Sequence, residues 1–243
     1  MKKIIHIVIS LDIGGAERMI ERLVEETSKD STVHQTIICL RDYGTIGRKL
    51  KKKGFEITSL GMSSVVLAPI IFYKLAKILK IKRPNAVYTW MYHSMIIGGL
   101  AASFCGVKNI IWMIRNTEIP QGKFSLTSVI RKLCSILSSY IPDKIVCNAE
   151  AGRLFHLKLG FCKENMIVVS NGYNMNSFKP SNNIRKKTRS NLNLAEDSLV
   201  VGIVGRFDPL KDHENFVKAA GEISKRFNTV SYTHLTLPTI LLV

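Results

Sequence analysis

The sequence is poor in acidic side chains. Its 243 residues include 35 lysines and arginines but only 18 aspartates and glutamates, which leaves a formal net charge of +17 with histidine neutral. A chain this basic suits an anionic partner, which can be a nucleic acid, an anionic membrane surface or a phosphorylated small molecule. It has no basic region leading into a heptad repeat, no paired Cys/His zinc spacing and no aromatic RNA-binding signature. We therefore expect no nucleic-acid partner and favour a membrane surface or a phosphorylated ligand.

Long apolar runs are also missing. The longest, at residues 65–73 and 95–107, fall short of the roughly 18–20 residues needed to cross a bilayer. The start of the chain is similar to a signal peptide, but its apolar run contains His6 and meets Asp12 and Glu17 without a small-residue cleavage site. The five cysteines include no CxxC pair, so we expect them to be buried and reduced. These absences predict a cytoplasmic protein, which would meet the inner face of the plasma membrane only from the side.

Short runs rich in valine and isoleucine alternate with segments of helical period. The runs predict strands at Lys3–Ser10, His34–Leu40, Phe55–Leu60, Ala86–Trp90, Asn109–Ile114, Lys144–Asn148 and Met166–Ser170. The segments between them predict helices at Ala16–Ser28, Ile46–Lys53, Pro69–Ile81, Ser94–Phe104, Ser125–Ser139 and Glu150–Leu159. Such alternation is typical of a parallel sheet covered on both faces. Residues 1–170 are therefore predicted to form one complete, doubly wound α/β domain.

The composition changes after residue 170. Residues 171–197 are rich in Asn, Ser, Lys and Pro and predict a linker. Residues 198–230 begin a second unit, with an apolar strand at Leu199–Val204 and a helix that Asp212 caps and that runs to about Phe227. One strand and one helix cannot close a sheet, so this second domain is expected to be incomplete. Residues 231–243 contain no Lys, Arg, Asp or Glu; we expect a non-native tail there, and a genuine apolar segment is the alternative.

Two glycines lie between the first predicted strand and the first predicted helix. Gly14 and Gly15 let the backbone approach a ligand, and the helix N-terminus that follows offers free N–H groups to an anion. Both are candidate substrate-binding residues with a phosphate as the natural ligand, and a tight strand-to-helix turn is the alternative. The loop lacks the G-x-G-x-x-G fingerprint of dinucleotide binding.

Four segments that occur in order along the chain carry a family resemblance. They are Gly14–Arg18, Val146–Glu150, Ile167–Asn174 with Phe178–Pro180, and Val204–Lys211. In this order they resemble the family 4 glycosyltransferases of the GT-B fold, over residues 1 to about 230. The resemblance implies two Rossmann-like domains, with an acceptor held by the first and a UDP- or GDP-sugar donor held by the second. It also implies retaining chemistry without a metal or any other cofactor.

The resemblance gives roles to two basic residues of the last segment. Arg206 and Lys211 match the Arg and Lys that bind the donor diphosphate and stabilise the leaving group in the family. Fixed cations suit that role because negative charge grows on the departing nucleotide. The sequence contains no D-x-D, which fits metal independence. We treat both residues as candidate catalytic residues, with ordinary surface charges as the alternative.

Three further residues are candidate substrate-binding residues. Arg115 stands where the family has a histidine after its fifth strand, and an arginine cannot act as a general base there but can bind phosphate or sugar hydroxyls. His93 follows the fourth predicted strand at the edge where ligands collect in such sheets. It is expected either to contact a substrate or to cap a helix. Asn171 belongs to the third matching segment.

The hypothesis that follows is a hexosyltransferase-type retaining enzyme of polysaccharide or cell-envelope synthesis. Its acceptor would be a surface glycan or a sugar on polyprenyl diphosphate, at an anionic membrane that attracts basic loops. The family's pair of glutamates seven residues apart, which binds the donor late in the second domain, is missing at that position. We therefore expect an inactive N-terminal fragment. The alternatives are a non-catalytic acceptor- or partner-binding domain and a GT-B nucleotide-sugar epimerase.

Overall fold

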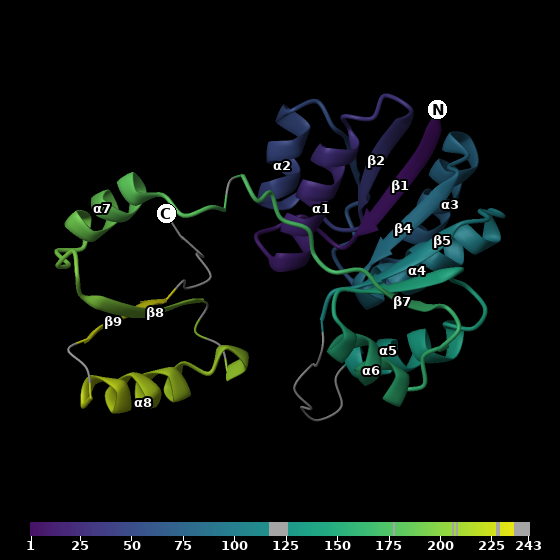
Figure 1. The fold of residues 1–243 in the computed structure, drawn as a ribbon. Coiled ribbons are helices and arrows are strands. Elements are labelled where there is room, and N and C mark those ends of the chain that lie inside the picture. Colours follow the sequence, from purple (N-terminus) through teal and green to yellow (C-terminus); the bar gives the residue numbers. More distant parts are fainter. Residues whose placement is uncertain (117–125, 177, 206, 208, 227–228, 236–243) are drawn as a thin grey trace. The chain divides into compact units, whose positions relative to one another are not determined.

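The computed structural model of the chain describes residues 1–116, 126–176, 178–205, 207, 209–226 and 229–235. These residues fall into two compact units, Met1–Gly172 and Tyr173–Val243 (Figure 1). The limits predicted for the linker and the C-terminal tail stay predictions.

The first unit is built on a sheet of seven parallel strands. In sheet order these are β3 (Glu56–Ser59), β2 (Val33–Cys39), β1 (Lys2–Val8), β4 (Ala86–Trp90), β5 (Ile110–Ile114), β6 (Lys144–Cys147) and β7 (Met166–Val168). This parallel sheet between helices confirms the predicted doubly wound α/β fold. The sequence suits such a fold because strands buried on both faces are rich in valine and isoleucine. The chain order reverses between β1 and β4, where such sheets open a crevice at the carboxyl ends of their strands.

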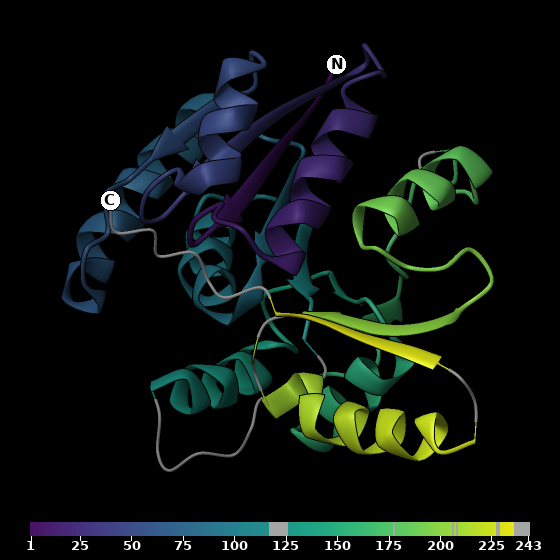
Figure 2. The same cartoon turned by 90° about the vertical axis from the view of Figure 1, so that its left-hand side faces the viewer.

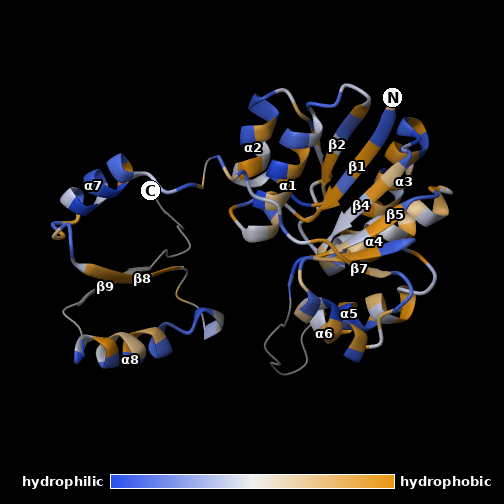
Figure 3. Ribbon diagram, in the orientation of Figure 1, coloured by the Kyte–Doolittle hydropathy of each residue, from blue (hydrophilic) through white to orange (hydrophobic). Residues whose placement is uncertain are grey.

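Helices cover both faces of this sheet. In the described residues they are α1 (Gly15–Thr27), α2 (Gly44–Lys52), the short 3-10 helix η1 (Val65–Leu67), α3 (Ala68–Lys82), α4 (Met91–Phe104), α5 (Leu126–Leu137) and α6 (Glu150–Lys158). Ile20 of α1 and Leu50 of α2 belong to one apolar core, whereas Leu75 of α3 and Met95 of α4 belong to another. Figure 3 shows hydrophobic residues along β1 between these layers and hydrophilic residues on α1 and α2. No helix among the described residues is long and apolar enough to cross a membrane.

A buried histidine links three strands of the sheet. His6 of β1 is fully buried, and Trp90 Nε1 of β4 donates to its Nδ1 over 3.2 Å. His6 Nε2 then donates to Gln35 Oε1 of β2 over 3.0 Å, and Gln35 Nε2 donates to the main-chain oxygen of Val24 over 3.2 Å. Burial disfavours the charged ring more than the Gln35 bond favours it, so the pKa of His6 is lowered from 6.5 to about 4. His6 is therefore neutral near pH 7 and fixes the orientation of Trp90.

This histidine predicts a pH-dependent stability. Because its folded-state pKa is lowered, the contribution of His6 is fully present above pH 6.5 and is lost as the pH falls toward 4. Lowering the pKa of His6 from 6.5 to about 4 corresponds to about 3 kcal/mol in the free energy of unfolding. Urea unfolding at a series of pH values measures it, and His6→Gln should show a shallower pH dependence over this interval. An unchanged slope in the variant would contradict the assignment to His6, because the carboxylates titrate in both proteins.

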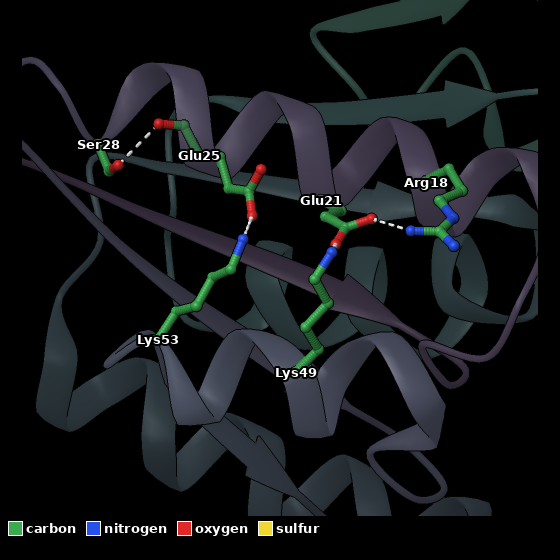
Figure 4. Close-up of polar contacts among 6 residues, drawn as sticks. All are labelled: Arg18, Glu21, Glu25, Ser28, Lys49 and Lys53. Carbon is green, nitrogen blue, oxygen red and sulfur yellow. Dashed lines mark hydrogen bonds and ion pairs between the residues drawn. The ribbon is translucent and has the colours of Figure 1, made fainter. Parts of the chain in front are cut away.

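Ion pairs join α1 to α2 and to the residue that follows α2 (Figure 4). The buried carboxylate of Glu21 accepts from Arg18 Nη1 over 2.8 Å and from Lys49 Nζ over 2.7 Å, and Glu25 pairs with Lys53. Burial alone would raise the pKa of Glu21, but the bonds from Lys49 and Arg18 outweigh it and lower the pKa. The pairs therefore hold α2 and its C-cap residue Lys53 against α1; together these carry the five basic residues of Arg48–Lys53.

The buried and the exposed pairs of α1 make a matched comparison. Glu21→Ala should destabilise the chain by about 1–2 kcal/mol, because a buried carboxylate with two charged donors is lost. In a double-mutant cycle with Lys49→Ala we expect a coupling energy of about 1 kcal/mol. The exposed pair of Glu26 with Lys29, whose side chains are 73% and 71% exposed, should give a coupling near zero. Equal couplings for both pairs in urea unfolding would count against this account.

The second unit holds a parallel strand pair with a helix beside it. Its elements are α7 (Asn182–Asn191), β8 (Leu199–Gly205), the 3-10 helix η2 (Pro209–Lys211), α8 (His213–Ser224) and β9 (Thr229–Leu235). Strands β8 and β9 pair with Leu199 opposite Thr229, and α8 runs along them (Figure 2). The side chain of Asp212 accepts from the Asn215 N–H, so the predicted helix cap is confirmed.

Two elements of this unit differ from the expected pattern. Helix α7 lies inside the predicted linker. The helix is stabilised because Ser181 caps its first turn, and because Arg185 and Arg189 donate to main-chain oxygens of the following turn. These are polar contacts, which a search for hydrophobic period does not detect. Strand β9 includes residues 231–235 of the predicted non-native tail. The non-native origin of residues 231–243 stays a prediction.

Candidate functional site

The loops at the carboxyl ends of β1, β4, β5, β6 and β7 carry most of the residues predicted to bind substrate in the first unit. Arg115 and Asn116 directly follow β5, Asn148 follows β6, and Asn171 lies three residues after β7. Carboxyl ends of parallel strands meet at one edge of a sheet, so these side chains can lie close together. The structure shows which of them do.

Arg115 is held from two sides. Its Nη1 donates to Asn171 Oδ1 over 2.9 Å, and its guanidinium carbon lies 5.1 Å from the ring centroid of Trp90. A cation over an indole face is attracted by the ring, and Trp90 is itself fixed by the bond to His6 described above. Burial lowers the pKa of Arg115, yet an arginine stays charged at neutral pH. The structure thus brings together two of the predicted residues, Arg115 and Asn171, on a support that the sequence did not reveal.

A second chain of hydrogen bonds orients Asn116. His156 Nδ1 donates to the main-chain oxygen of Gly152 over 2.7 Å, which leaves Nε2 to accept from the Tyr92 hydroxyl over 2.6 Å. The Tyr92 oxygen accepts from Asn116 Nδ2 over 3.1 Å. Burial lowers the pKa of His156 and raises the pKa of Tyr92, so both stay neutral. Asn116 is therefore held with its amide nitrogen turned toward the protein.

In the described part of the chain, three buried polar atoms of the residues that follow β5 and β6 have no hydrogen-bond partner. They are Arg115 Nε, Asn116 Oδ1 and Asn148 Oδ1. Buried polar atoms are costly to leave unpaired, by about 1–3 kcal/mol each, so such a group points to a ligand or water. One cationic donor and two carbonyl acceptors suit a ligand that carries both negative charge and hydroxyl groups. A phosphorylated sugar has this chemistry.

The glycine loop is fixed in place by the start of α2. Gly44 has a φ of +60°, and a Cβ there would collide with the Leu11 main chain, so only glycine fits. The Ile46 N–H donates to the Leu11 oxygen over 2.8 Å. A Cβ on Gly14 would meet the Glu17 carboxylate, so an acidic side chain already lies at this helix N-terminus. Burial, then the nearby Asp12, raises the pKa of Glu17. The phosphate predicted for Gly14 and Gly15 stays a prediction, and this carboxylate disfavours it.

His93 lies in the first turn of α4 and is half-buried. The helix begins three residues earlier than expected, at Met91, whose φ of +66° makes the sharp turn out of β4. Trp90 is the N-cap residue, and no side chain caps this end, so the alternative role of His93 as a helix cap is not what the structure shows. Burial lowers its pKa, which leaves a neutral ring near the sheet edge. Its contact to a substrate stays a prediction.

The two predicted catalytic residues belong to the second unit. Lys211 ends η2 and is exposed, and a Cβ on Gly205 would lie 3.6 Å from its Cγ, so its stem passes over the end of β8. Lys211 directly precedes Asp212, the N-cap residue of α8; its catalytic role stays a prediction. Arg206 lies outside the described residues. In the described parts of the chain no three His, Cys, Asp or Glu side chains are grouped as metal ligands; metal independence stays a prediction.

Sequence reasoning missed Trp90, Asn116, Asn148 and the Tyr92–His156 pair. Asn116 and Asn148 were detectable in principle, because Asn148 ends the predicted strand Lys144–Asn148 and Asn116 comes two residues after the predicted strand Asn109–Ile114. The contact of Trp90 with Arg115 was not, since it joins residues from different strands.

Comparisons with known proteins agree with this fold. No family model matches the chain. EpsF of Bacillus subtilis (strain 168), which has a provisional glycosyltransferase name, is 22% identical over 232 residues, covering 93% of this chain and 59% of EpsF. An Escherichia coli UDP-Gal:alpha-D-GlcNAc-diphosphoundecaprenol alpha-1,3-galactosyltransferase is 24% identical over 147 residues, which cover 60% of this chain and 38% of that enzyme. This chain therefore spans about 59% of the length of EpsF and less of the galactosyltransferase.

Solved structures show the same architecture. Anabaena Alr3699/HepE in complex with UDP matches with a TM-score of 0.76 at 18% identity, over 91% of this chain and 58% of that one. The UDP-GlcNAc 2-epimerase of Methanocaldococcus jannaschii matches with a TM-score of 0.62 at 13% identity, over 97% of this chain and 66% of that one. The narrower assignment to family 4 stays a prediction. The chain has the GT-B fold, and its relatives in sequence are glycosyltransferases.

Proposed function

We propose that the protein is a retaining glycosyltransferase of family 4, which moves a hexosyl group from a UDP- or GDP-sugar to a lipid-linked or surface-glycan acceptor. The observation that carries the proposal is the group of unpartnered buried atoms on Arg115, Asn116 and Asn148. Together with the GT-B fold, this group supports an acceptor that carries phosphate and sugar hydroxyls. The E. coli relative, whose name includes a sugar on diphosphoundecaprenol, supports the same class of acceptor.

The donor would bind the second unit through Arg206 and Lys211. The relation to HepE, which was solved with UDP, supports a nucleotide donor. As the bond to the leaving nucleotide breaks, negative charge develops on the diphosphate, and a fixed ammonium and guanidinium would stabilise it without a metal. Acceptor phosphate would meet Arg115 at the sheet edge of the first unit. The proposed place of work is the inner face of the plasma membrane.

We further propose that this 243-residue chain by itself transfers little or no sugar. It spans 58% of the HepE chain, and the glutamate pair expected to bind the donor is absent from it. Catalysis needs donor and acceptor held together, so a weak donor site alone removes most of the rate.

Calorimetric titration with UDP- and GDP-sugars tests these statements on the chain itself. We expect no micromolar donor binding, and clear micromolar binding would contradict the inactivity. The epimerase alternative has support in the similarity to a UDP-GlcNAc 2-epimerase. Release of an epimerised sugar without any acceptor would favour it over transfer, and binding of a partner with no sugar chemistry would favour a non-catalytic domain.

A further inference from the structure

Helices α3, α4 and α5 lie in a stretch of the chain that is almost free of acidic residues. Between Glu56 and Asp143 the sequence has ten lysines and arginines and one acidic residue, Glu118, so this stretch carries +9 of the total +17. Helices α3, α4 and α5 all belong to it, and α4 packs against both of the others. None of the three contains an aspartate or a glutamate.

Helix α5 exposes a stripe of large apolar side chains. Leu126, Val129, Leu133 and Ile136 are 54%, 54%, 45% and 57% exposed. Their spacing of three and four residues places them on one side of the helix. The other side packs into the core through Cys134 and partly buried neighbours, so α5 is apolar on both sides. Apolar area of this kind on a helix surface marks an interaction site.

Helices α3 and α4 add exposed aromatic and basic side chains to the same layer. Tyr73 is 70% exposed and is followed by the exposed Lys74 and Lys77. Phe104, at the end of α4, is 66% exposed and has Lys80 Nζ 5.1 Å from its ring centroid. The layer thus combines apolar side chains that can enter a lipid headgroup region with ammonium groups that can stay at its surface.

We propose that the outer face of α3, α4 and α5 docks on an anionic lipid bilayer. Charge decides the occupant: a second copy of this chain would bring the same positive layer and be repelled, whereas anionic headgroups are attracted by each lysine and arginine. The inference deepens the proposed function, because a lipid-linked acceptor would be reached from such a surface. Binding to the bilayer does not itself require that function.

Flotation of the 243-residue chain with vesicles tests the proposal. We expect binding to vesicles of phosphatidylcholine with phosphatidylglycerol, little binding to phosphatidylcholine alone, and loss of binding at high salt. Lys77 of α3 and Lys132 of α5 are both exposed. Replacing both with alanine should lower the partition coefficient about 25-fold, since each lysine near an anionic surface raises it about fivefold. Leu133→Ser with Ile136→Ser should weaken it as well, without a change in unfolding midpoint.

Arg48→Ala with Lys52→Ala is the matched control, because it removes two exposed charges from α2 on the other face of the sheet. It should bind vesicles like the parent chain to within about twofold to threefold. Equal weakening by the Lys77/Lys132 and Arg48/Lys52 double variants would show that net charge alone drives binding, and would overturn the proposal. Equal binding to neutral and anionic vesicles would overturn it too, and so would a salt-resistant dimer in place of vesicle binding. The two proposals fail separately. If vesicle binding follows these expectations but no active form of the protein transfers sugar, the proposed function is contradicted and the docking face is still supported.

Discussion

Replacing Lys211 with alanine in an active form of the protein is expected to lower kcat by about 10²–10³-fold. The reason is the charge that develops on the departing nucleotide diphosphate, which a fixed donor stabilises mainly in the transition state. The stem of Lys211 passes over Gly205 at the end of β8, and Lys211 itself belongs to the 3-10 turn η2. Initial rates of sugar transfer with saturating donor and acceptor measure the effect.

Lys218→Ala is the control for this variant. Lys218 is exposed on α8 of the same unit and pairs only at the surface with Glu214, over 2.6 Å. Its loss should leave kcat within about twofold, because an exposed pair contributes little. Wild-type turnover by Lys211→Ala would remove Lys211 from the proposed mechanism.

The second large effect is expected at Arg115. Arg115→Ala should lower kcat/KM for the acceptor by about tenfold to hundredfold, the range for loss of a hydrogen bond to a charged group. Arg115→Lys should recover part of this, because it keeps the charge but loses the planar fork that bonds Asn171 and stacks on Trp90. The effect is read in kinetics with varied acceptor at saturating donor.

Asn171→Ala separates binding from positioning at the same site. It removes the acceptor of the Arg115 Nη1 bond, so it should raise KM for the acceptor by less than Arg115→Ala does. Arg48→Ala, the same change on the exposed surface of α2, should have no effect. Unchanged acceptor kinetics in Arg115→Ala would contradict an acceptor site at this edge.

Hydrophobic periodicity and composition predicted the strands and helices of the first unit well, for a physical reason. A parallel sheet is buried on both faces, so its strands are short apolar runs that stand out between amphipathic helices. The early start of α4 was not predictable, because it depends on Met91 taking up a left-handed conformation. Helix α7 was also missed, since polar caps and arginine bonds hold it rather than a hydrophobic face.

Residues of the candidate site were predicted mainly where the family resemblance points to them. Arg115 and Asn171 could be named from the family resemblance, but their contact joins residues 56 positions apart. The support beneath Arg115 depends on His6 and Trp90, which are 84 positions apart and which any sequence pattern would assign to the core. The carboxylate of Glu17 over Gly14 shows the opposite case, in which a glycine loop that suggests a phosphate site already faces an acid.

The proposed reaction is sugar transfer with retention by a GT-B enzyme. The most direct measurement uses a purified, active form of the protein, a UDP- or GDP-sugar and a polyprenyl-diphosphate-linked acceptor, with a chelator present. NMR of the product should show a new glycosidic bond with the anomeric configuration of the donor, formed as fast as without the chelator. Inverted configuration, a need for added metal, or epimerised sugar with no new bond would contradict the account.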